Sequence, residues 1–263
     1  MRLSPFAPID AALAPAPDPA RVGWLGEWEY AHRGVHGASA AENSPCAFAE
    51  AIRRGMGIEC DVQKSRDGRA MVFHDWELDR LTAASGAIGL RTAAELETIP
   101  IAGREDCIPT LERTLAQVAG AVPLLVEIKS KRGHPPAPLC HAVARAIEGY
   151  RGRHAIMSFD PRVARWFRRH APATVRGLVV TEEDARGARG AIGRHLALWQ
   201  ARPDFLAYDV RDLPSRFAGA QRARGLPLLT WTVRSPELRA RAALHADAPI
   251  AEGAGLSPCA HEA

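Results

Sequence analysis

Short apolar segments alternate with longer segments of helical period from about residue 29 onward. The apolar segments have the length of strands, and the longer ones carry alanine, leucine and arginine at the spacing of amphipathic helices. Strands are predicted at 29–32, 57–62, 70–73, 123–128, 154–158, 175–180, 204–208, 227–233 and 248–251. Helices are predicted at about 44–54, 110–119, 138–149, 161–170, 182–200, 214–224 and 235–245. This alternation is typical of βαβ units.

One connection is too short for a parallel crossover. Only residues 63–69 separate strands 57–62 and 70–73, and they contain the turn signal Asp67-Gly68, whereas a parallel crossover needs about a dozen residues. Strand 70–73 is therefore predicted to be a hairpin partner. The other eight strands predict one (β/α)8 TIM barrel. The alternative is an open doubly wound sheet, which the lack of a G-x-G-x-x-G motif after the first strand disfavours.

The predicted domain organisation is simple. Residues 1–27, rich in alanine and proline, are expected to form an irregular N-terminal extension that packs through Trp24 and Trp28. Residues 28–263 are expected to form the barrel, with a small insertion at about 75–109 that has its own helical stretch at about 92–97.

Composition narrows the function class. The 263 residues are 47% hydrophobic and 24% charged, which is typical of a globular protein. The net charge is +4, but the basic residues are spread among 30 acidic ones, with small clusters only at 129–132 and 165–169. A nucleic-acid partner is therefore not expected. The sequence predicts no particular oligomeric state.

Cysteine usage and hydropathy indicate a compartment. The five cysteines show no C-x-x-C spacing, and no apolar run approaches the roughly 18 residues of a membrane helix. No signal peptide is recognisable at the N-terminus. We expect a cytoplasmic protein without stable membrane insertion.

Polar residues gather where the predicted strands end, which is where barrel enzymes carry their active sites. The residues concerned are His32, Arg33, Glu59, Asp61, His74, Glu127, Lys129 and Trp231. Alternation along a strand puts Glu59 and Asp61 on one face. If Glu127 joins them, three carboxylates converge, and a cation is needed between them. All-oxygen ligands favour Mg²⁺ or Ca²⁺ over zinc.

Each of these residues alone has an ordinary structural explanation, as a solvated charge or a hydrogen-bonded histidine. Their conjunction at the same end of successive strands favours a site. Two histidines, a hard cation and two basic side chains suit phosphoryl chemistry, in which one histidine accepts a proton and the other donates one.

An ordered series of motifs carries a family resemblance from about Tyr30 to Gly253. The motifs are Ala31-His32-Arg33-Gly34, Glu42-Asn43-Ser44, Ile58-Glu59-Cys60-Asp61-Val62, Val72-Phe73-His74-Asp75, Leu78-Asp79-Arg80-Leu81-Thr82, Ile108-Pro109-Thr110-Leu111-Glu112, Val126-Glu127-Ile128-Lys129, Ser158-Phe159-Asp160 and Trp231-Thr232-Val233. In order and spacing they resemble the glycerophosphodiester phosphodiesterase family.

The resemblance implies a (β/α)8 barrel that hydrolyses a small-molecule substrate, a glycerophosphodiester from lipid and glycerol metabolism, to an alcohol and sn-glycerol 3-phosphate. It implies that His32 and His74 are the acid/base pair, that Glu59, Asp61 and Glu127 bind one divalent cation, Mg²⁺ or Ca²⁺, and that Arg33 and Lys129 contact the phosphate. The headgroup, the order in which the histidines act, and the choice between a cyclic phosphate and direct attack by water stay open.

The chain departs from the family pattern in places. Ala41 stands where the family commonly has proline, and Glu252 stands where its last strand ends in aspartate, so the role of Glu252 is open. Glu42, Asn43 and Ser44 are expected either to start a helix or to reach the site. Trp231 is predicted to wall the leaving-group pocket, with a packed aromatic as the alternative.

Two other functions compete with this prediction. A phosphodiesterase of the same fold acting on lysophospholipids, like related phospholipase D-like enzymes, would work faster on micelles than on soluble substrates. A non-catalytic barrel that binds a phosphate ligand would bind glycerophosphodiesters without turnover, but binding alone would not require two proton-transfer groups.

Overall fold

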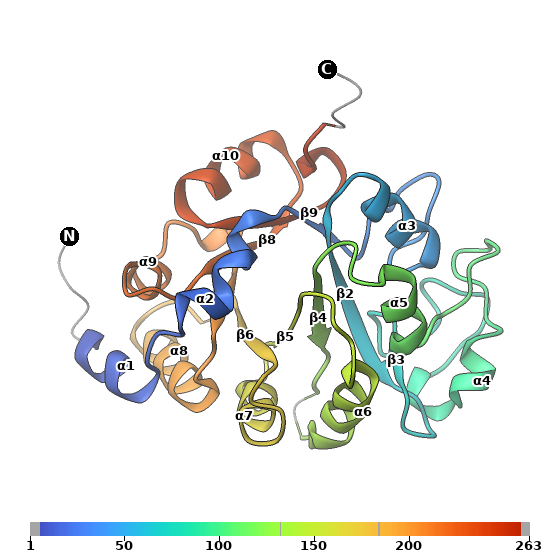
Figure 1. Cartoon of the computed structure of the whole chain (residues 1–263), viewed down its shortest axis with the longest axis horizontal. Coiled ribbons are helices and arrows are strands. Elements are labelled where there is room, and N and C mark those ends of the chain that lie inside the picture. The colour runs from blue at the N-terminus through green and yellow to red at the C-terminus, as the bar shows by residue number, and fades with distance from the viewer. Residues whose placement is uncertain (1–5, 132, 184, 259–263) are drawn as a thin grey trace. The chain divides into compact units, whose positions relative to one another are not determined.

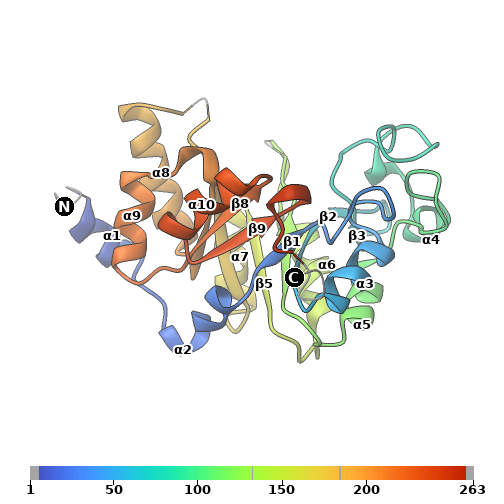
Figure 2. The same ribbon diagram turned by 90° about the horizontal axis from the view of Figure 1, so that it is seen from above.

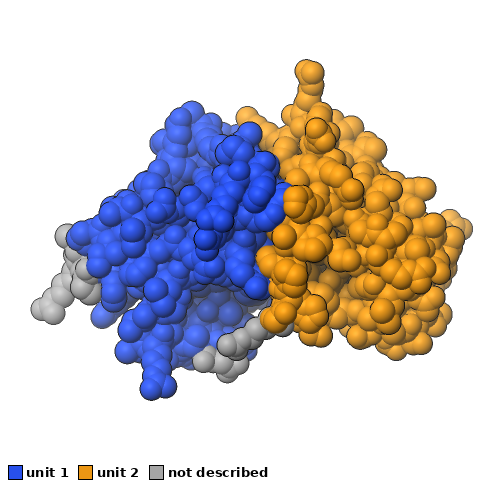
Figure 3. All heavy atoms as spheres, turned by 90° about the horizontal axis from the view of Figure 1, so that it is seen from below, with its two compact units in different colours: residues 1–29, 155–257 blue, residues 30–154, 258–263 orange. Residues whose placement is uncertain are grey.

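The computed structural model describes residues 6–131, 133–183 and 185–258. The predictions that involve residues 1–5, Arg132 or Cys259 lie outside these ranges. The chain divides into two compact units, unit 1 with residues 1–29 and 155–257 and unit 2 with residues 30–154 and 258–263, coloured blue and orange in Figure 3. Each unit is described by itself.

Unit 2 is built around its longest strand. Strand β2 (Gly57–Lys64) pairs in parallel with β1 (Tyr30–His32) and β4 (Leu124–Ile128), and antiparallel with β3 (Ala70–Val72). Gly68 turns the β2–β3 hairpin at a φ of 80°, as the Asp67-Gly68 pair predicts. The helices of this unit are α3 (Pro45–Arg53), α4 (Ala93–Leu96), α5 (Leu111–Val118) and α6 (Ala137–Ile147), with the 3₁₀ turn η2 (Ile88–Leu90) (Figure 1).

Unit 1 contains a run of parallel strands with helices between them. The strands are β5 (His154–Ser158), β6 (Val175–Val180), β7 (Phe205–Asp209), β8 (Leu228–Val233) and β9 (Ala248–Ala251), each paired in parallel with the next. The helices that follow are α7 (Pro161–His170), α8 (Ala188–Ala201), α9 (Arg216–Ala223) and α10 (Pro236–His245), with the 3₁₀ turns η3 (Val210–Asp212) and η4 (Gly253–Gly255). Buried Leu198, Leu206, Tyr208 and Phe217 belong to its core.

The fold is a (β/α)8 barrel, as the alternation of elements predicts. Among the described residues, eight strands run parallel, with helices between most of them, and β3 is the additional hairpin strand. One predicted helix is shorter than expected: α8 begins at Ala188, not at residue 182. The reason is a set of contacts with distant residues: the backbone N–H of Glu182 donates to Asp212 (2.6 Å) and its carboxylate accepts from Tyr208 (2.6 Å), which holds Glu182 in a loop.

The insertion at 75–109 has its own apolar anchor in unit 2. Helix α4 confirms the predicted helical stretch, and Thr92 and Glu95 form a capping box at its start. Leu78, Ile88 and Leu96 are buried together with residues of the hairpin. The segment is therefore held by its own hydrophobic contacts.

The N-terminal segment is more regular than the predicted irregular extension. It forms α1 (Ala7–Leu13), α2 (Pro19–Val22) and the 3₁₀ turn η1 (Gly23–Glu27), and α2 begins with an Asp18 cap followed by proline. Its described buried apolar residues are Ala14, Val22 and Leu25, while Trp24 and Trp28 are only half-buried. The boundary at residue 28 stays a prediction. Figure 2 shows α1 beside α8 and α9 within unit 1.

Candidate active site

Strand register within unit 2 brings the predicted acidic residues to one end of neighbouring strands. His32 of β1 lies opposite Glu59 of β2, and Asp61 lies opposite Glu127 of β4. Glu59 and Asp61 alternate with apolar residues and so share a face of β2. Both are 1% exposed, and Glu127 is 8% exposed. These three acidic side chains are therefore largely shielded from water.

The three carboxylates form a compact cluster that two basic side chains contact. One oxygen from each of Glu59, Asp61 and Glu127 lies within 4.8 Å of the others. Lys129 Nζ lies 2.8 Å from an oxygen of Asp61 and 2.6 Å from one of Glu127. Arg33 Nε lies 3.1 Å from the other oxygen of Asp61. The two basic residues predicted to contact phosphate therefore lie beside the carboxylates.

Electrostatics distinguishes Asp61 from Glu59. Burial alone would raise the pKa of Asp61, but the charges of Lys129 and Arg33 outweigh it and hold that pKa below its ordinary value. Burial, reinforced by the charges of Asp61 and Glu127, raises the pKa of Glu59 well above its ordinary value. Burial would also lower the pKa of Lys129, yet Asp61 and Glu127 raise it.

This charge distribution fits a bound cation. The cluster holds three carboxylates against two basic side chains, and Arg33 is also shared with Glu42. Burial first, and then the charges of Asp61 and Glu127, raise the pKa of Glu59, and Arg33 and Lys129 do not offset them. Oxygen ligands in such a cluster suit hard divalent ions.

A tight turn after β1 sets the position of Arg33. Arg33 and Gly34 have φ values of 57° and 79°, and the Arg33 backbone N–H donates to Glu59 (3.1 Å). A Cβ on Gly34 would come within 2.8 Å of the Ala47 backbone, so only glycine fits. This turn directs both the backbone and the side chain of Arg33 towards the carboxylates.

The three residues before α3 divide between two roles. Ser44 caps the helix by accepting from the Ala47 N–H (3.2 Å). Asn43, at a φ of 56°, donates its amide to Asp61 (2.9 Å) and accepts from the Asp61 N–H (3.2 Å). Glu42 accepts from Arg33 (2.7 Å). Sequence reasoning left both roles open, and the structure assigns one to each part of the motif.

His74 follows β3 and is oriented by its neighbours. Its Nδ1 lies 2.7 Å from Asp75 Oδ1, and the Gln63 amide donates to the backbone carbonyls of His74 (3.0 Å) and Asp75 (3.2 Å). Burial lowers the pKa of His74, and the nearby charge of Asp61 opposes that shift only in part. Asp75 thus contacts the imidazole ring at Nδ1 and leaves Nε2 on the opposite side of the ring.

Sequence reasoning missed three residues of this neighbourhood. Gln63, Asp75 and Arg80 support His74, but none was predicted as a site residue. Gln63 follows Asp61 by two positions on the same face of the strand, which is a signal that could have found it. Arg80 belongs to one of the motifs of the family resemblance, but no local pattern shows that it joins Asp75, five positions before it, to Glu42, 38 positions away.

Trp231 lies in unit 1, on β8. Its indole N–H donates to the Ala207 carbonyl (2.9 Å), and Phe159 packs edge-on against it with ring centroids 5.4 Å apart. Phe159 is 47% exposed. Within its own unit, Trp231 is a half-buried member of an aromatic pair, and the predicted contact with a leaving group stays a prediction.

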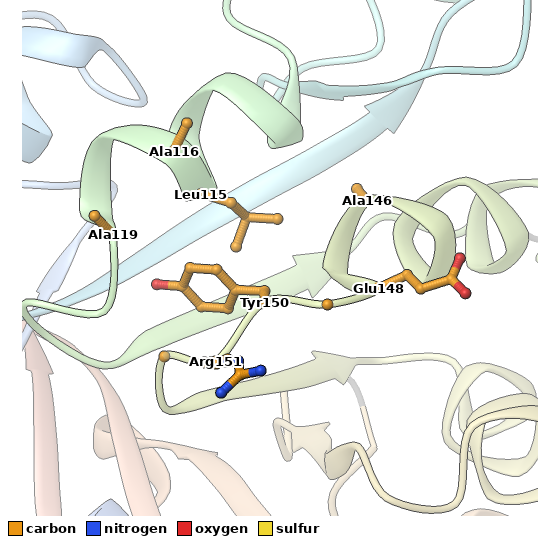
Figure 4. Close-up of a pocket in the computed structure, with 9 residues that line it drawn as sticks. Leu115, Ala116, Ala119, Ala146, Glu148, Tyr150 and Arg151 are labelled. Atoms are coloured by element: carbon orange, nitrogen blue, oxygen red, sulfur yellow. The ribbon is translucent and has the colours of Figure 1, made fainter.

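A separate hollow of about 390 Å³ lies between α5, α6 and the loop at 148–152 (Figure 4). Tyr150 lies beside Leu115 there, and its hydroxyl accepts from the Gly120 N–H (3.1 Å). The lining residues described for this hollow include neither the carboxylates nor the histidines. It is distinct from the candidate site.

Comparison with known proteins decides the family. The model of the glycerophosphoryl diester phosphodiesterase family matches residues 32–251, a range that includes both histidines, the three carboxylates and Trp231. The chain belongs to the glycerophosphoryl diester phosphodiesterase family. It is therefore a member of a family of phosphodiester hydrolases, as the ordered motifs predict.

Individual members of the glycerophosphoryl diester phosphodiesterase family are similar over most of their length. A glycerophosphodiester phosphodiesterase of Caldanaerobacter subterraneus is 29% identical, over 79% of this chain and 86% of the relative. The solved glycerophosphodiester phosphodiesterase of Thermotoga maritima is 25% identical with a TM-score of 0.69, covering 84% of this chain and 92% of that one.

A third relative adds a ligand. An Oleispira antarctica phosphodiesterase, solved in complex with the product sn-glycerol-3-phosphate, has a TM-score of 0.74 at 22% identity, covering 85% of this chain and 92% of its own. At this identity the likeness confirms the barrel fold. In the described part of the present chain, no helix has the length and apolar character needed to span a membrane.

Proposed function

We propose that this protein is a metal-dependent glycerophosphodiester phosphodiesterase that releases sn-glycerol 3-phosphate and an alcohol. The observation that carries the proposal is the buried cluster of Glu59, Asp61 and Glu127 with Arg33 and Lys129 beside it. Membership of the family and the product bound by the Oleispira antarctica relative support the choice of substrate.

The residues divide the work between binding and proton transfer. Glu59, Asp61 and Glu127 would hold one divalent cation, Mg²⁺ or Ca²⁺, which when bound supplies positive charge for the phosphate oxygens. Arg33 and Lys129 add two fixed cations that attract the same anionic group. The acidic cluster thereby becomes a phosphate site despite its own negative charge.

Two histidines would move the protons. The lowered pKa of His74 leaves its ring neutral at pH 7, so that it can accept a proton from the attacking oxygen at Nε2. His32, with Nε2 4.0 Å from Glu59, would then donate a proton to the departing alcohol oxygen. The attacking oxygen is either the neighbouring hydroxyl of the glycerol, which gives a cyclic phosphate that water opens, or water itself.

The proposed substrate class also bears on where the enzyme works. Glycerophosphodiesters are small and water-soluble, so the proposal needs no membrane insertion. Cys46, Cys60, Cys107 and Cys140 are free thiols, which is compatible with a cytoplasmic enzyme of lipid and glycerol metabolism.

The test measures sn-glycerol 3-phosphate released from glycerophosphocholine or glycerophosphoethanolamine with Mg²⁺ or Ca²⁺. His32→Ala should lower kcat about 100-fold or more, because a proton-transfer group is lost. His141→Ala is the control, since His141 is an exposed histidine on α6 of the same unit. Excess EDTA should abolish turnover. Full activity of His32→Ala, or full activity in EDTA, contradicts the proposal.

A further inference from the structure

A chain of charged contacts runs through unit 2 from the carboxylate cluster to His74. Asp61 contacts Arg33, and Arg33 Nη1 donates to Glu42 (2.7 Å). Glu42 in turn accepts from Arg80, whose Nη1 and Nη2 lie 3.0 and 2.7 Å from its two oxygens. Arg80 Nε donates to Asp75 Oδ2, and Asp75 Oδ1 contacts His74. Arg80 is the link between the two halves of this chain.

The geometry of Arg80 is that of a bridge between two carboxylates. Its guanidinium uses Nη1 and Nη2 for Glu42 and Nε for Asp75, so one planar group fixes both partners at once. The side chain is nevertheless 48% exposed, which means that packing alone does not hold it there. A lysine ammonium is a point charge and lacks this fork.

The two partners depend on Arg80 to different degrees. Glu42 keeps Arg33 as a second cationic partner if Arg80 is removed. Among the contacts of the Asp75 carboxylate, Arg80 holds Oδ2 while His74 occupies Oδ1. Removing Arg80 therefore frees one oxygen of Asp75, and the carboxylate can rotate away from the ring.

We propose that Arg80 is a positioning residue for His74. It fixes Asp75, which holds the imidazole with its Nδ1–H towards the carboxylate and Nε2 free for proton transfer. Through Glu42 it ties this arrangement to Arg33, so that a proton-transfer group and a phosphate-binding group keep one mutual geometry within unit 2. The kinetic consequence of this inference rests on the proposed function.

The kinetic test compares Arg80→Ala and Arg80→Lys with a matched control. Arg69→Ala removes an arginine of the same unit with nearly equal exposure, 46% against 48%, which pairs with Glu112 away from His74. Arg80→Ala should lower kcat about tenfold or more while KM for glycerophosphocholine changes less than about threefold. Arg80→Lys should recover part of the loss, because one ammonium can still contact Asp75. Arg69→Ala should match the wild type.

A spectroscopic test needs no substrate. In ¹⁵N spectra of the histidine rings at neutral pH with Mg²⁺, the His74 signals, assigned by their loss in His74→Gln, should report one tautomer protonated at Nδ1. In Arg80→Ala they should shift towards a mixture of the two tautomers, while Arg69→Ala leaves them unchanged.

The outcomes separate this inference from the proposed function. Unchanged His74 signals in Arg80→Ala, or a kcat equal to that of Arg69→Ala, would overturn the role of Arg80. A wild-type protein that turns over no glycerophosphodiester would instead overturn the proposed function, and the ring spectra would still decide whether Arg80 positions His74.

Discussion

Glu59 and Asp61 are two residues apart on one strand, yet their surroundings differ. Asp61 contacts Lys129, Arg33 and the amide of Asn43. Glu59 accepts from the Arg33 N–H and lies 4.0 Å from His32. Equal burial therefore raises the pKa of Glu59 and fails to raise that of Asp61. Glu59 gains most from an added cation.

This difference predicts how stability depends on pH in the metal-free protein. The folded state retains a proton on Glu59 that the unfolded chain releases above about pH 4.3, so the contribution of Glu59 to the free energy of unfolding falls as pH rises towards the folded pKa. In excess EDTA, the melting temperature of the wild type should therefore decline between pH 5 and pH 8 relative to that of Glu59→Gln.

Metal should reverse this trend, because a carboxylate must lose its proton to bind a cation. Adding Mg²⁺ or Ca²⁺ should raise the melting temperature of the wild type more at pH 8 than at pH 5. Equal pH dependence of the wild type and Glu59→Gln in EDTA would show that Glu59 is not the group responsible.

Asn43 offers a second test at the residue scale. Its amide fixes Asp61 through two hydrogen bonds, while its φ of 56° is a conformation that glycine adopts easily. Asn43→Gly therefore removes the amide without straining the turn. The Mg²⁺ concentration for half-maximal activity should rise about 10- to 100-fold. Ser44→Gly, which removes the neighbouring helix cap, should leave that concentration unchanged even where it lowers stability.

Site residues that lie close together in the sequence could be predicted, whereas contacts between residues distant in the sequence could not. The Glu59 and Asp61 pair shares a strand face by periodicity alone. The role of Asn43 depends on Asp61, 18 positions away, and Arg80 bridges the nearby Asp75 to Glu42, 38 positions away, which no local pattern reveals. Lys129 was predicted to face phosphate, and only the three-dimensional arrangement shows that it also neutralises Asp61 and Glu127.

At the scale of elements, the turn between β1 and α3 holds Arg33 in place. Gly34→Ala should destabilise the protein by about 2 kcal/mol or more, because a positive φ costs about 1 kcal/mol and the clash with Ala47 adds to it. Gly55→Ala is the control, since Gly55 has a φ of 65° with no atom within 4 Å of an added Cβ. It should cost about 1 kcal/mol.

Chemical denaturation measures both variants, and activity separates them further. Gly34→Ala should also lower kcat, because the Arg33 backbone moves away from Glu59, whereas folded Gly55→Ala should keep wild-type kcat. Equal losses of stability in the two variants would contradict the close approach of Gly34 to Ala47.

Strands and most helices were predictable because their signals are local. Apolar period, a proline at the first helical position and a capping serine place α10 within one residue of its prediction. The start of α8 was wrong because Glu182 satisfies its hydrogen bonds with Tyr208 and Asp212, which belong to other elements. Short helices such as α1 lack the length over which a period can be recognised.

At the scale of the molecule, a buried carboxylate anchors the N-terminal helix α1 within unit 1. Asp10 of α1 is fully buried and accepts from the indole of Trp199 (2.8 Å) and the amide of Gln221 (2.8 Å). His195 Nδ1 lies 2.8 Å from the same carboxylate. These partners come from α8 and α9, so the N-terminal segment contributes to the core of this unit.

Removing this carboxylate should cost more than removing an exposed one. Asp10→Ala leaves two buried groups and the half-buried indole of Trp199 without their acceptor and should lower the free energy of unfolding by about 3 kcal/mol in urea denaturation. Asp18→Ala, which removes the exposed cap of α2, should cost about 1 kcal/mol or less. Similar losses for the two would show that α1 is only loosely attached.

The barrel itself could be predicted by counting strands, because the hydrophobic periodicity of each strand and most helices is visible in the local sequence. The N-terminal segment could not, because the value of Asp10 depends on partners 185 or more positions away. The same limit applies to Trp231, whose aromatic partner Phe159 follows a different strand.

The apolar anchor of the insertion has a practical consequence for protein engineering. Leu78, Ile88 and Leu96 hold the segment through their buried apolar contacts, while Leu90 at its surface is 70% exposed. The exposed side chain of Leu90 is therefore a suitable position for a fluorescent label. A label there would lie on the same insertion as Arg80 and would show whether this segment moves during turnover.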